Sequence, residues 1–482
     1  MAFADDLENL HESQKLEFKE ASKGLPFDLW ETYSAFANTE GGEIVLGVKE
    51  DGPRKFEIVG VQNPAVLMED FWKTVRNAQR VERDVMLSDD VQALEVLPSK
   101  TVVVISVPRA ERTDKPVRVY DKRQKAFVAY VRRGEDDFLA SDDDLRLMTY
   151  DNTSGADRRP LDGFTIASFC ADTVTRYRNL FAAYKPGSPW VNESDEDFLF
   201  HIGALARGRG DTLQATQAGL LAFGYDYEIA NYSPHFIVDY RQETSGKLRW
   251  DDRVVSSSAD WSGNLIDFYL TVSDRIKRYF KMPFATDASG MTHGSENPVT
   301  EAVNEAIVNA LVHAYYGADA EVRVVLSENE VVVSNSGSFL IDHDVAVAGG
   351  ISAARNPTLM NMFYLIGASD RAGSGLYSIW SIWQRVWGAL PTLEELHSPV
   401  KVRMILPLVS PKGNGELEIH GAAGQDLSKV IALAKSVTAA DVAKEFAVSE
   451  RTAQKRLKRL MDQSGGRVTR VRDGRVWRYS IK

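Results

Sequence analysis

The segment 300–316 constrains the fold most, because it places polar side chains at regular intervals inside a strongly apolar sequence. Glu305, Asn309 and His313 are four residues apart, so in a helix they lie on one face. Apolar residues such as Val308 and Leu311 fill the positions between them. An ordinary amphipathic helix with its polar face in solvent would have the same spacing. The density of apolar residues instead favours a helix whose polar face lines a pocket.

Glycine-containing turns follow this segment. A strand is predicted over 330–337, and an Arg-Asn-Pro turn separates it from a second predicted helix over 376–386. Backbone N–H groups at the start of a helix preceded by glycines can bind phosphate. The sequence contains no Gly-x-x-x-x-Gly-Lys-Ser/Thr motif, so a Walker-type helicase motor is not expected. The candidates for ligand contact in these turns are Asn335, Gly337, Arg355, Gly373 and Gly375.

The order of these elements resembles the GHKL-type C-terminal region of RecG-like ATP-dependent helicases. The resemblance implies a GHKL (Bergerat) α/β sandwich that binds ATP with Mg²⁺. In it, Glu305 would polarise the attacking water and Asn309 would ligate the metal. The family's adenine-loop Asp is Asn335 here, which offers an amide in place of a carboxylate. The residues assigned to cofactor binding are Asn309, His313 and Arg355, with Asn335 and Gly337 at the adenine end and Gly373 and Gly375 in the phosphate lid.

The N-terminal part contains a second pattern, ESQKLEFK over 12–19 and SAFANTEGGEIVLGV over 34–48. These runs resemble the Schlafen AlbA-like domain, an α+β fold, across about the first 150 residues. The resemblance implies that Glu12, Glu17 and Glu50 hold Mg²⁺ or Mn²⁺ and activate water for phosphodiester cleavage. The alternative is that Glu12 and Glu17 form an ion-pair network with Lys19. The domain would then bind DNA or RNA without cutting it.

The C-terminal part predicts a winged helix. A first helix begins near Thr438, Ser449 caps a second, and the Asp-Gly pair at 473–474 predicts a hairpin between strands at 468–471 and 476–481. Basic and amide groups on a second helix suit the major groove of duplex DNA, although many winged helices bind protein instead. The candidate nucleic-acid contacts are Arg451, Thr452, Gln454, Lys455, Lys458 and Arg459 on the helix, and Arg472 and Arg475 on the wing.

The charge distribution favours contact with DNA over protein at this end. The chain has a net charge of -11, but residues 425–482 contain 14 Lys and Arg against 6 Asp and Glu. The C-terminal part is therefore +8 and the rest about -19. A single cysteine, an acidic start without a signal-peptide pattern and the absence of long apolar runs indicate a cytoplasmic protein without membrane contact.

The sequence thus predicts an α/β multidomain protein. Its parts are a Schlafen AlbA-like domain at 1–150, a connecting α/β domain at 161–290, a GHKL-type ATP-binding domain at 291–410 and a winged helix at 425–482. Linkers are expected at 153–160 and 411–416. GHKL domains commonly dimerise around ATP, so a homo-oligomer is expected by resemblance.

Three functions fit these parts. The preferred one is an ATP-responsive, DNA-binding transcriptional regulator. The first alternative is a metal-dependent endonuclease or endoribonuclease that cuts tRNA or DNA, is gated by ATP and acts in phage defence. The second alternative is an interaction scaffold without catalytic activity.

Overall fold

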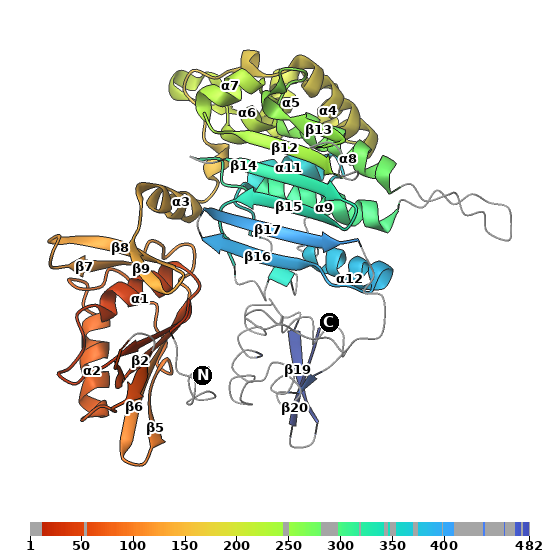
Figure 1. Ribbon diagram of the computed structural model, residues 1–482. Helices are drawn as coiled ribbons and strands as arrows, with labels where there is room; N and C mark the ends of the chain where they lie inside the picture. The colour runs from red at the N-terminus through yellow and green to blue at the C-terminus, as the bar shows by residue number, and fades with distance from the viewer. Residues whose placement is uncertain are drawn as a thin grey trace. The chain divides into compact units, whose positions relative to one another are not determined.

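The computed structural model describes two compact units (Figure 1). The N-terminal unit ends at Thr153, and the central unit begins at Ser154. Across the described chain, no helix is long and apolar enough to cross a membrane. The structure describes residues 12–52, 55–243, 250–280, 297–317, 320–341, 346–347, 353–369, 375–397, 399–408, 437–438, 457, 468–473 and 476–481.

The N-terminal unit is built on a four-stranded sheet of order β1-β2-β6-β5, in which β1 and β2 are parallel. A second, three-stranded sheet of order β7-β8-β9 packs its β8 against α1. The bounds are β1 Leu16–Lys19, α1 Leu29–Asn38, β2 Gly42–Leu46, β3 Val48–Glu50, β4 Phe56–Ile58, α2 Pro64–Val75, β5 Val91–Leu97, β6 Lys100–Val107, β7 Arg118–Asp121, β8 Ala126–Arg133, β9 Asp136–Leu139 and α3 Asp142–Asn152.

Asn38, at the end of α1, joins the helix to the three-stranded sheet. Its side chain is 4% exposed. It donates to the carbonyls of Val117 and Tyr130, each at 3.0 Å, and accepts the Val117 N–H at 2.8 Å. A buried amide needs such partners, because an unsatisfied polar group costs about 1–3 kcal/mol. The Ala-Phe-Ala-Asn run therefore supplies both apolar packing and a polar anchor.

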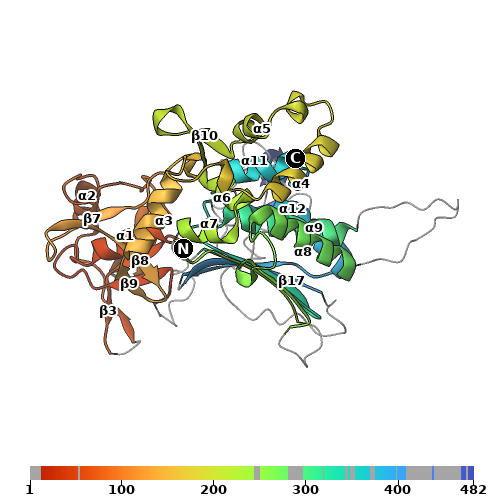
Figure 2. The same ribbon diagram turned by 90° about the horizontal axis from the view of Figure 1, so that it is seen from above.

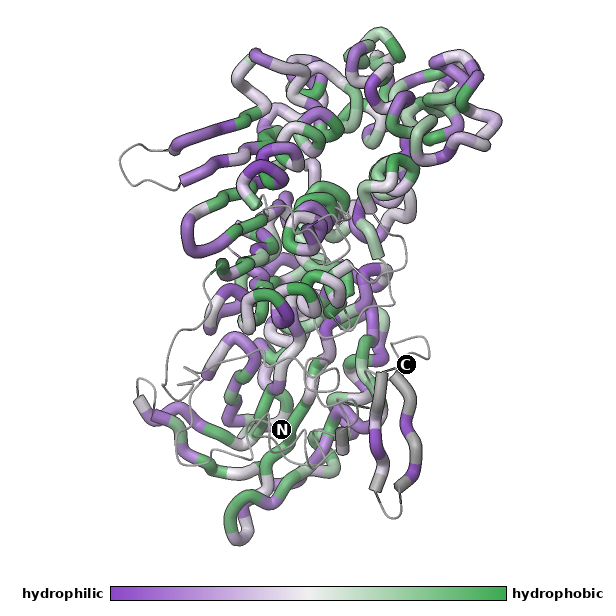
Figure 3. Tube along the Cα trace, turned by 90° about the vertical axis from the view of Figure 1, so that its right-hand side faces the viewer, coloured by the Kyte–Doolittle hydropathy of each residue, from purple (hydrophilic) through white to green (hydrophobic). Residues whose placement is uncertain are grey.

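The central unit contains a six-stranded sheet of order β13-β12-β14-β15-β17-β16, with helices α8, α9 and α12 on one face (Figure 2). Most of its buried apolar residues belong to one core. The ends of β12 and β13 next to 244–249 are hydrophilic (Figure 3). The bounds are α4 Ala171–Tyr184, α5 Asp195–His201, β10 Leu205–Arg207, β11 Leu213–Ala215, α6 Gln217–Phe223, α7 Asp226–Tyr232, β12 Ile237–Glu243, β13 Asp252–Val255, α8 Leu265–Tyr279, α9 Pro298–His313, β14 Glu321–Ser327, β15 Glu330–Ser336, α11 Pro357–Leu365, α12 Gly375–Trp387, β16 Thr392–His397 and β17 Val400–Pro407.

The segments 161–290 and 291–410 share this sheet. Strand β12 of the first segment pairs in parallel with β14 of the second, with Val238 opposite Val322 and Tyr240 opposite Val324. All four side chains are fully buried. The two segments, treated separately in the sequence, therefore contribute to one folded unit.

The stretch 153–160 contains the boundary between the units, as expected of a linker, but its second half is packed. Asp157 is fully buried. Its carboxylate accepts the N–H groups of Thr358 and Leu359 at 2.8 and 3.0 Å and the Thr358 hydroxyl at 3.0 Å. Asp157 thus caps α11, since these N–H groups have no partner inside the helix.

The C-terminal strands form a three-stranded sheet of order β18-β20-β19: β18 Val437–Thr438, β19 Val468–Asp473 and β20 Val476–Ile481. Strands β19 and β20 confirm the two predicted strands. Thr438, near which the first helix was predicted to begin, lies in β18, and Leu457 is buried and helical; the rest of the predicted helix-turn-helix lies outside the described residues. The winged helix remains a prediction.

Candidate functional site

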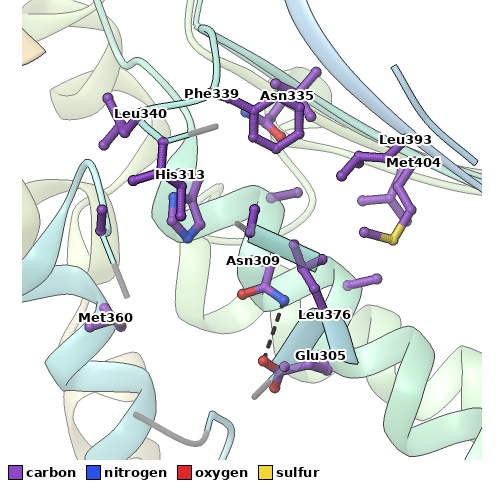
Figure 4. A pocket seen from close by; sticks show the side chains of 18 of the residues that line it. Glu305, Asn309, His313, Asn335, Phe339, Leu340, Met360, Leu376, Leu393 and Met404 are labelled. Carbon is purple, nitrogen blue, oxygen red and sulfur yellow. Dashed lines mark hydrogen bonds between the residues drawn. The ribbon is translucent and has the colours of Figure 1, made fainter. Parts of the chain in front are cut away.

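Helix α9 carries the predicted polar row and positions it against a pocket. The side chain of Asn297 accepts the Val299 N–H at 3.0 Å, and Pro298 follows at the first helical position, so the helix begins at a defined residue. One face is fully buried in the core through Val303, Ile307 and Leu311. Glu305, Asn309 and His313 project from the opposite face into the pocket (Figure 4). The predicted pocket-facing helix is confirmed, although it ends at His313 and not at residue 316.

The pocket is partly open to solvent, and its two sides differ in chemical character. Polar groups line the α9 side, and apolar side chains of three strands line the other. The sequence patterns missed this apolar wall, because it forms only when β15, β17 and β16 become neighbours in the sheet. The wall consists of Val333 of β15, Val402 and Met404 of β17 and Leu393 of β16, with Phe339 and Leu340 from the loop after β15.

Glu305 and Asn309 lie together beneath the start of α12. The Asn309 amide nitrogen donates to the Glu305 carboxylate at 3.3 Å. Gly375, the first residue of α12, is so close that a Cβ atom there would lie 2.1 Å from a Glu305 oxygen. A side chain at this position would force the Glu305 carboxylate to move. Gly375 joins the predicted site, while Gly373 lies outside the described residues.

Asn335 reaches the pocket from β15. It is 5% exposed, and its side chain points toward the pocket (Figure 4). Its amide nitrogen donates to the Ser336 carbonyl at 3.1 Å. That hydrogen bond engages one N–H of the amide and fixes the amide plane. The amide oxygen can therefore accept a hydrogen bond from a ligand.

Arg355 lies behind the pocket wall. It is 5% exposed and donates to two backbone carbonyls, those of His313 and, at 2.8 Å, Ser338. Gly337 has φ +106°, and a Cβ there would meet the guanidinium at 2.5 Å. The structure thus places Arg355 and Gly337 against each other, outside the residues that line the pocket. Their position indicates that they shape the site, and direct contact with a cofactor stays a prediction.

His313 is uncharged at neutral pH. Burial, together with the positive Arg355 guanidinium, lowers the pKa of its imidazole to about 4. A neutral imidazole can both donate and accept hydrogen bonds, whereas an imidazolium can only donate. His313 therefore offers the pocket a polar group without a positive charge.

The lowered pKa of His313 predicts a loss of stability in acid. Between the ordinary pKa of 6.5 and the folded value of about 4, the unfolded chain binds a proton that the folded chain does not. Stability therefore falls as the pH drops through this window. From pH 7.5 to pH 5, wild type should lose about 2 kcal/mol more than His313→Gln. Urea unfolding of both proteins followed by tryptophan fluorescence checks this. Equal losses in the two proteins would contradict the assignment.

One of the candidate carboxylates of the N-terminal unit, Glu17, belongs to an ion-pair network. Glu17 accepts hydrogen bonds from Lys19 and Arg132, each at 2.9 Å. Lys19 also donates to Asp28 at 2.7 Å. Burial opposes protonation of Lys19, but Glu17 and Asp28 outweigh it and raise the pKa of the ammonium. The Glu17–Lys19 pair is part of the network that the sequence left as the alternative to a metal site, whereas Glu12 accepts a backbone N–H instead.

Arg132 is the most buried member, with a side chain that is 1% exposed. It donates to Asp137 at 2.9 Å and to the Ser13 carbonyl at 3.0 Å, and its guanidinium lies 5.1 Å from the centre of the Phe36 ring. These contacts use both terminal nitrogens of the guanidinium, whereas its Nε atom is buried without a hydrogen bond among the described residues. The sequence patterns missed Arg132 because it is distant from the Glu17 motif in the chain.

Glu12 and Glu50 complete the predicted carboxylate set. Glu12 accepts the Phe18 N–H at 3.1 Å, and burial and the Glu17 carboxylate raise its pKa. Glu50 is an exposed residue at the end of β3. In the described part of the molecule, no group of three or more His, Cys, Asp or Glu side chains could hold a metal ion. The metal role of Glu12, Glu17 and Glu50 stays a prediction.

The described C-terminal strands include one residue that is predicted to contact nucleic acid, Arg472. Arg472 is exposed on β19, and its guanidinium lies 5.9 Å from the centre of the Trp477 ring on β20. Trp477 is 41% exposed. The other predicted contacts lie outside the described residues: Arg451, Thr452, Gln454, Lys455, Lys458, Arg459 and Arg475.

Three segments of the chain match known protein families. Residues 12–141 match the family described as Schlafen, AlbA_2. Residues 146–239 match a domain of unknown function, DUF8451. Residues 319–404 match the family described as "Putative ATP-dependent DNA helicase recG C-terminal". The chain therefore contains a Schlafen AlbA_2 domain and a RecG C-terminal domain.

Two solved structures are similar to the chain. The DIP2311 protein from Corynebacterium diphtheriae is 18% identical, with 97% of this chain and 92% of that chain covered and a TM-score of 0.43. The N-terminal domain of the "Putative ATP-dependent DNA Helicase RecG-related Protein" from Nitrosomonas europaea is 28% identical, with 29% of this chain and 89% of that chain covered and a TM-score of 0.23. No curated protein matches the chain.

Proposed function

We propose that the chain is an ATP-responsive regulator that binds ATP in the α9 pocket and binds nucleic acid through its other domains. One observation carries the nucleotide assignment. A single pocket brings together four polar side chains and the first residue of α12, which is a glycine. The converging residues are Glu305, Asn309, His313, Asn335 and Gly375.

The two sides of the pocket suit the two ends of ATP. The apolar wall, including Val333, Leu393 and Met404, provides a surface for the base, and the Asn335 oxygen can accept a hydrogen bond from the adenine amine. At the opposite end, the Asn309 carbonyl oxygen is a suitable ligand for Mg²⁺. A bound Mg²⁺ would neutralise phosphate charge. Glu305 would then orient and polarise a water molecule.

Nucleic acid would be bound at two places. The C-terminal basic part is proposed to bind duplex DNA through its predicted recognition helix and wing. The N-terminal domain is proposed to bind DNA or RNA without cleaving it. The commitment of Glu17 to Lys19 and Arg132 supports binding without cleavage, because a metal would have to displace a buried cation. Homo-oligomerisation, cytoplasmic location and control of transcription are part of the same proposal.

The nucleotide proposal is tested by separating binding from hydrolysis. We expect isothermal titration with ATP and Mg²⁺ to show binding to wild type. Asn309→Ala should weaken it at least tenfold, because the metal ligand is lost. Glu305→Gln should bind ATP like wild type, and any hydrolysis should fall by 10²-fold or more, because the carboxylate that polarises water is gone.

A matched control lies on the same helix. Asn304 is next to Glu305 but does not line the pocket, and its amide oxygen is buried without a hydrogen-bond partner in the structure. Asn304→Ala should therefore bind ATP like wild type. Absence of ATP binding by wild type, or equal affinity of Asn309→Ala and wild type, would refute the proposed site. Duplex affinity that is identical with and without ATP would refute the ATP response alone.

A further inference from the structure

The hairpin between β7 and β8 of the N-terminal domain presents lysines beside exposed aromatic rings. Its turn, 122–125, reads KRQK. Phe127, just after the turn, is 39% exposed, and Phe27, in the loop before α1, is 38% exposed. The Lys122 ammonium lies 5.4 Å from the centre of the Phe27 ring. The nucleotide pocket and the Glu17 network make no use of these side chains.

The conformation of the hairpin turn is fixed by hydrogen bonds to a buried side chain of the domain, Asp121. Asp121 is 4% exposed and accepts the Arg123 N–H at 2.6 Å and the Tyr130 hydroxyl at 3.0 Å. Burial opposes ionisation of Asp121, but these hydrogen bonds outweigh it and lower the pKa of the carboxyl group. Arg123 pairs with Glu31. Asp121 thus fixes the turn, and the Arg123 charge is balanced within the domain.

Lys122 and Lys125 differ from Lys19 and Arg132 of the same domain in their ion pairing. Lys19 and Arg132 are each bonded to two carboxylates. Within the residues that the structure describes, neither Lys122 nor Lys125 forms an ion pair. Both are exposed. Their positive charge is therefore available to an external anion.

The aromatic ring on the far side of the turn is also positioned by its neighbours. Phe127 lies opposite Tyr120 across the hairpin, with ring centres 5.7 Å apart at 71°. The edge-on contact holds the Phe127 ring and leaves more than a third of the residue in solvent. The exposed ring, fixed in position by its neighbour, provides a surface on which a base can stack. The lysines beside it, which form no ion pair among the described residues, can bind phosphate groups.

We infer that this hairpin binds single-stranded nucleic acid. Unpaired bases stack on exposed aromatic rings, and lysines contact the phosphates beside them. A duplex offers no free base face to Phe127, so single strands are favoured over duplex at this place. This inference rests on the proposed nucleic-acid binding of the N-terminal domain. It specifies the β7–β8 hairpin as the binding surface and single strands as the ligand.

The test measures fluorescence anisotropy of the full chain with fluorescein-labelled 20-nucleotide oligothymidylate and oligouridylate, over a range of salt concentrations. The double variant Lys122→Ala/Lys125→Ala should bind at least tenfold more weakly. Its plot of log affinity against log salt should be shallower by about 1.4, because two phosphate contacts are lost. Phe127→Leu should bind fivefold or more weakly with an unchanged salt slope, because it removes stacking and no charge.

A double variant of equal charge change, Lys55→Ala/Lys73→Ala, alters exposed lysines outside the hairpin and should bind like wild type. Circular dichroism of every variant confirms folding. Single-strand binding that survives both hairpin variants would overturn the inference and leave the proposed function intact. Binding of a labelled 20-base-pair duplex but not of single strands would also overturn the inference alone. If the wild-type protein binds neither single strands nor the duplex, both this inference and the proposed nucleic-acid binding are refuted.

Discussion

Replacement of Arg132 by Met should lower the free energy of local unfolding around α1 by about 3–5 kcal/mol. The substitution keeps most of the side-chain volume but leaves Glu17 and Asp137 without their shared cation. Both carboxylates are only 13% exposed. A buried charge that loses its partner is costly, since the remaining solvent cannot replace the lost hydrogen bonds. Hydrogen exchange of α1 peptides in the full chain measures this directly.

The control for Arg132→Met is Arg146→Met on α3. Arg146 is 66% exposed and pairs with Asp143, which is 61% exposed. Exposed pairs of this kind contribute about 0.3–0.5 kcal/mol, so exchange in α1 should not change. Equal exchange in the two variants would show that the buried network is dispensable. If Arg132→Met is destabilised as expected, the Glu17 network is needed for folding. Loss of nuclease activity in Glu17→Ala would then not distinguish a catalytic role of Glu17 from a role in folding. Glu50→Ala is therefore the informative test of the nuclease alternative.

The sequence predicts the elements of the site better than their assembly. Four-residue spacing is a local property, so the shared face of Glu305, Asn309 and His313 follows directly from the helix period. The parallel pairing of β12 with β14 joins residues far apart in the chain, and no local pattern reports it. The same holds for the apolar wall of the pocket, which depends on which strands become neighbours.

The roles of single charged residues were also hidden from the sequence. Glu17 matches a motif, but its two cations come from Lys19 nearby and from Arg132 on a distant strand. Asp157 lies in a stretch with linker composition, yet it is buried because α11 has N–H groups that need an acceptor. In both cases, long-range hydrogen bonding decides the environment of a carboxylate that local composition would place in solvent.

Replacement of Arg355 by Ala should have the largest effect on the nucleotide pocket. The substitution removes the donor to the carbonyls of His313 and Ser338, and each buried acceptor left unpaired costs about 1–3 kcal/mol. We expect the free energy of unfolding to fall by roughly 3 kcal/mol. The pocket wall between α9 and the loop after β15 should lose its fixed geometry, so ATP affinity should fall at least tenfold.

The pKa of His313 gives a readout of Arg355 that loss of stability alone would not produce. Burial lowers that pKa, and the Arg355 charge lowers it further. In Arg355→Ala, the imidazole should therefore titrate above its wild-type value of about 4, as measured by NMR of the labelled histidine ring at temperatures where the protein stays folded. Arg385→Ala, which removes an exposed arginine of α12, should leave both the pKa and ATP binding unchanged. An unchanged His313 pKa in Arg355→Ala would mean that burial alone keeps the imidazole neutral, and that Arg355 acts on the pocket only through the two carbonyls.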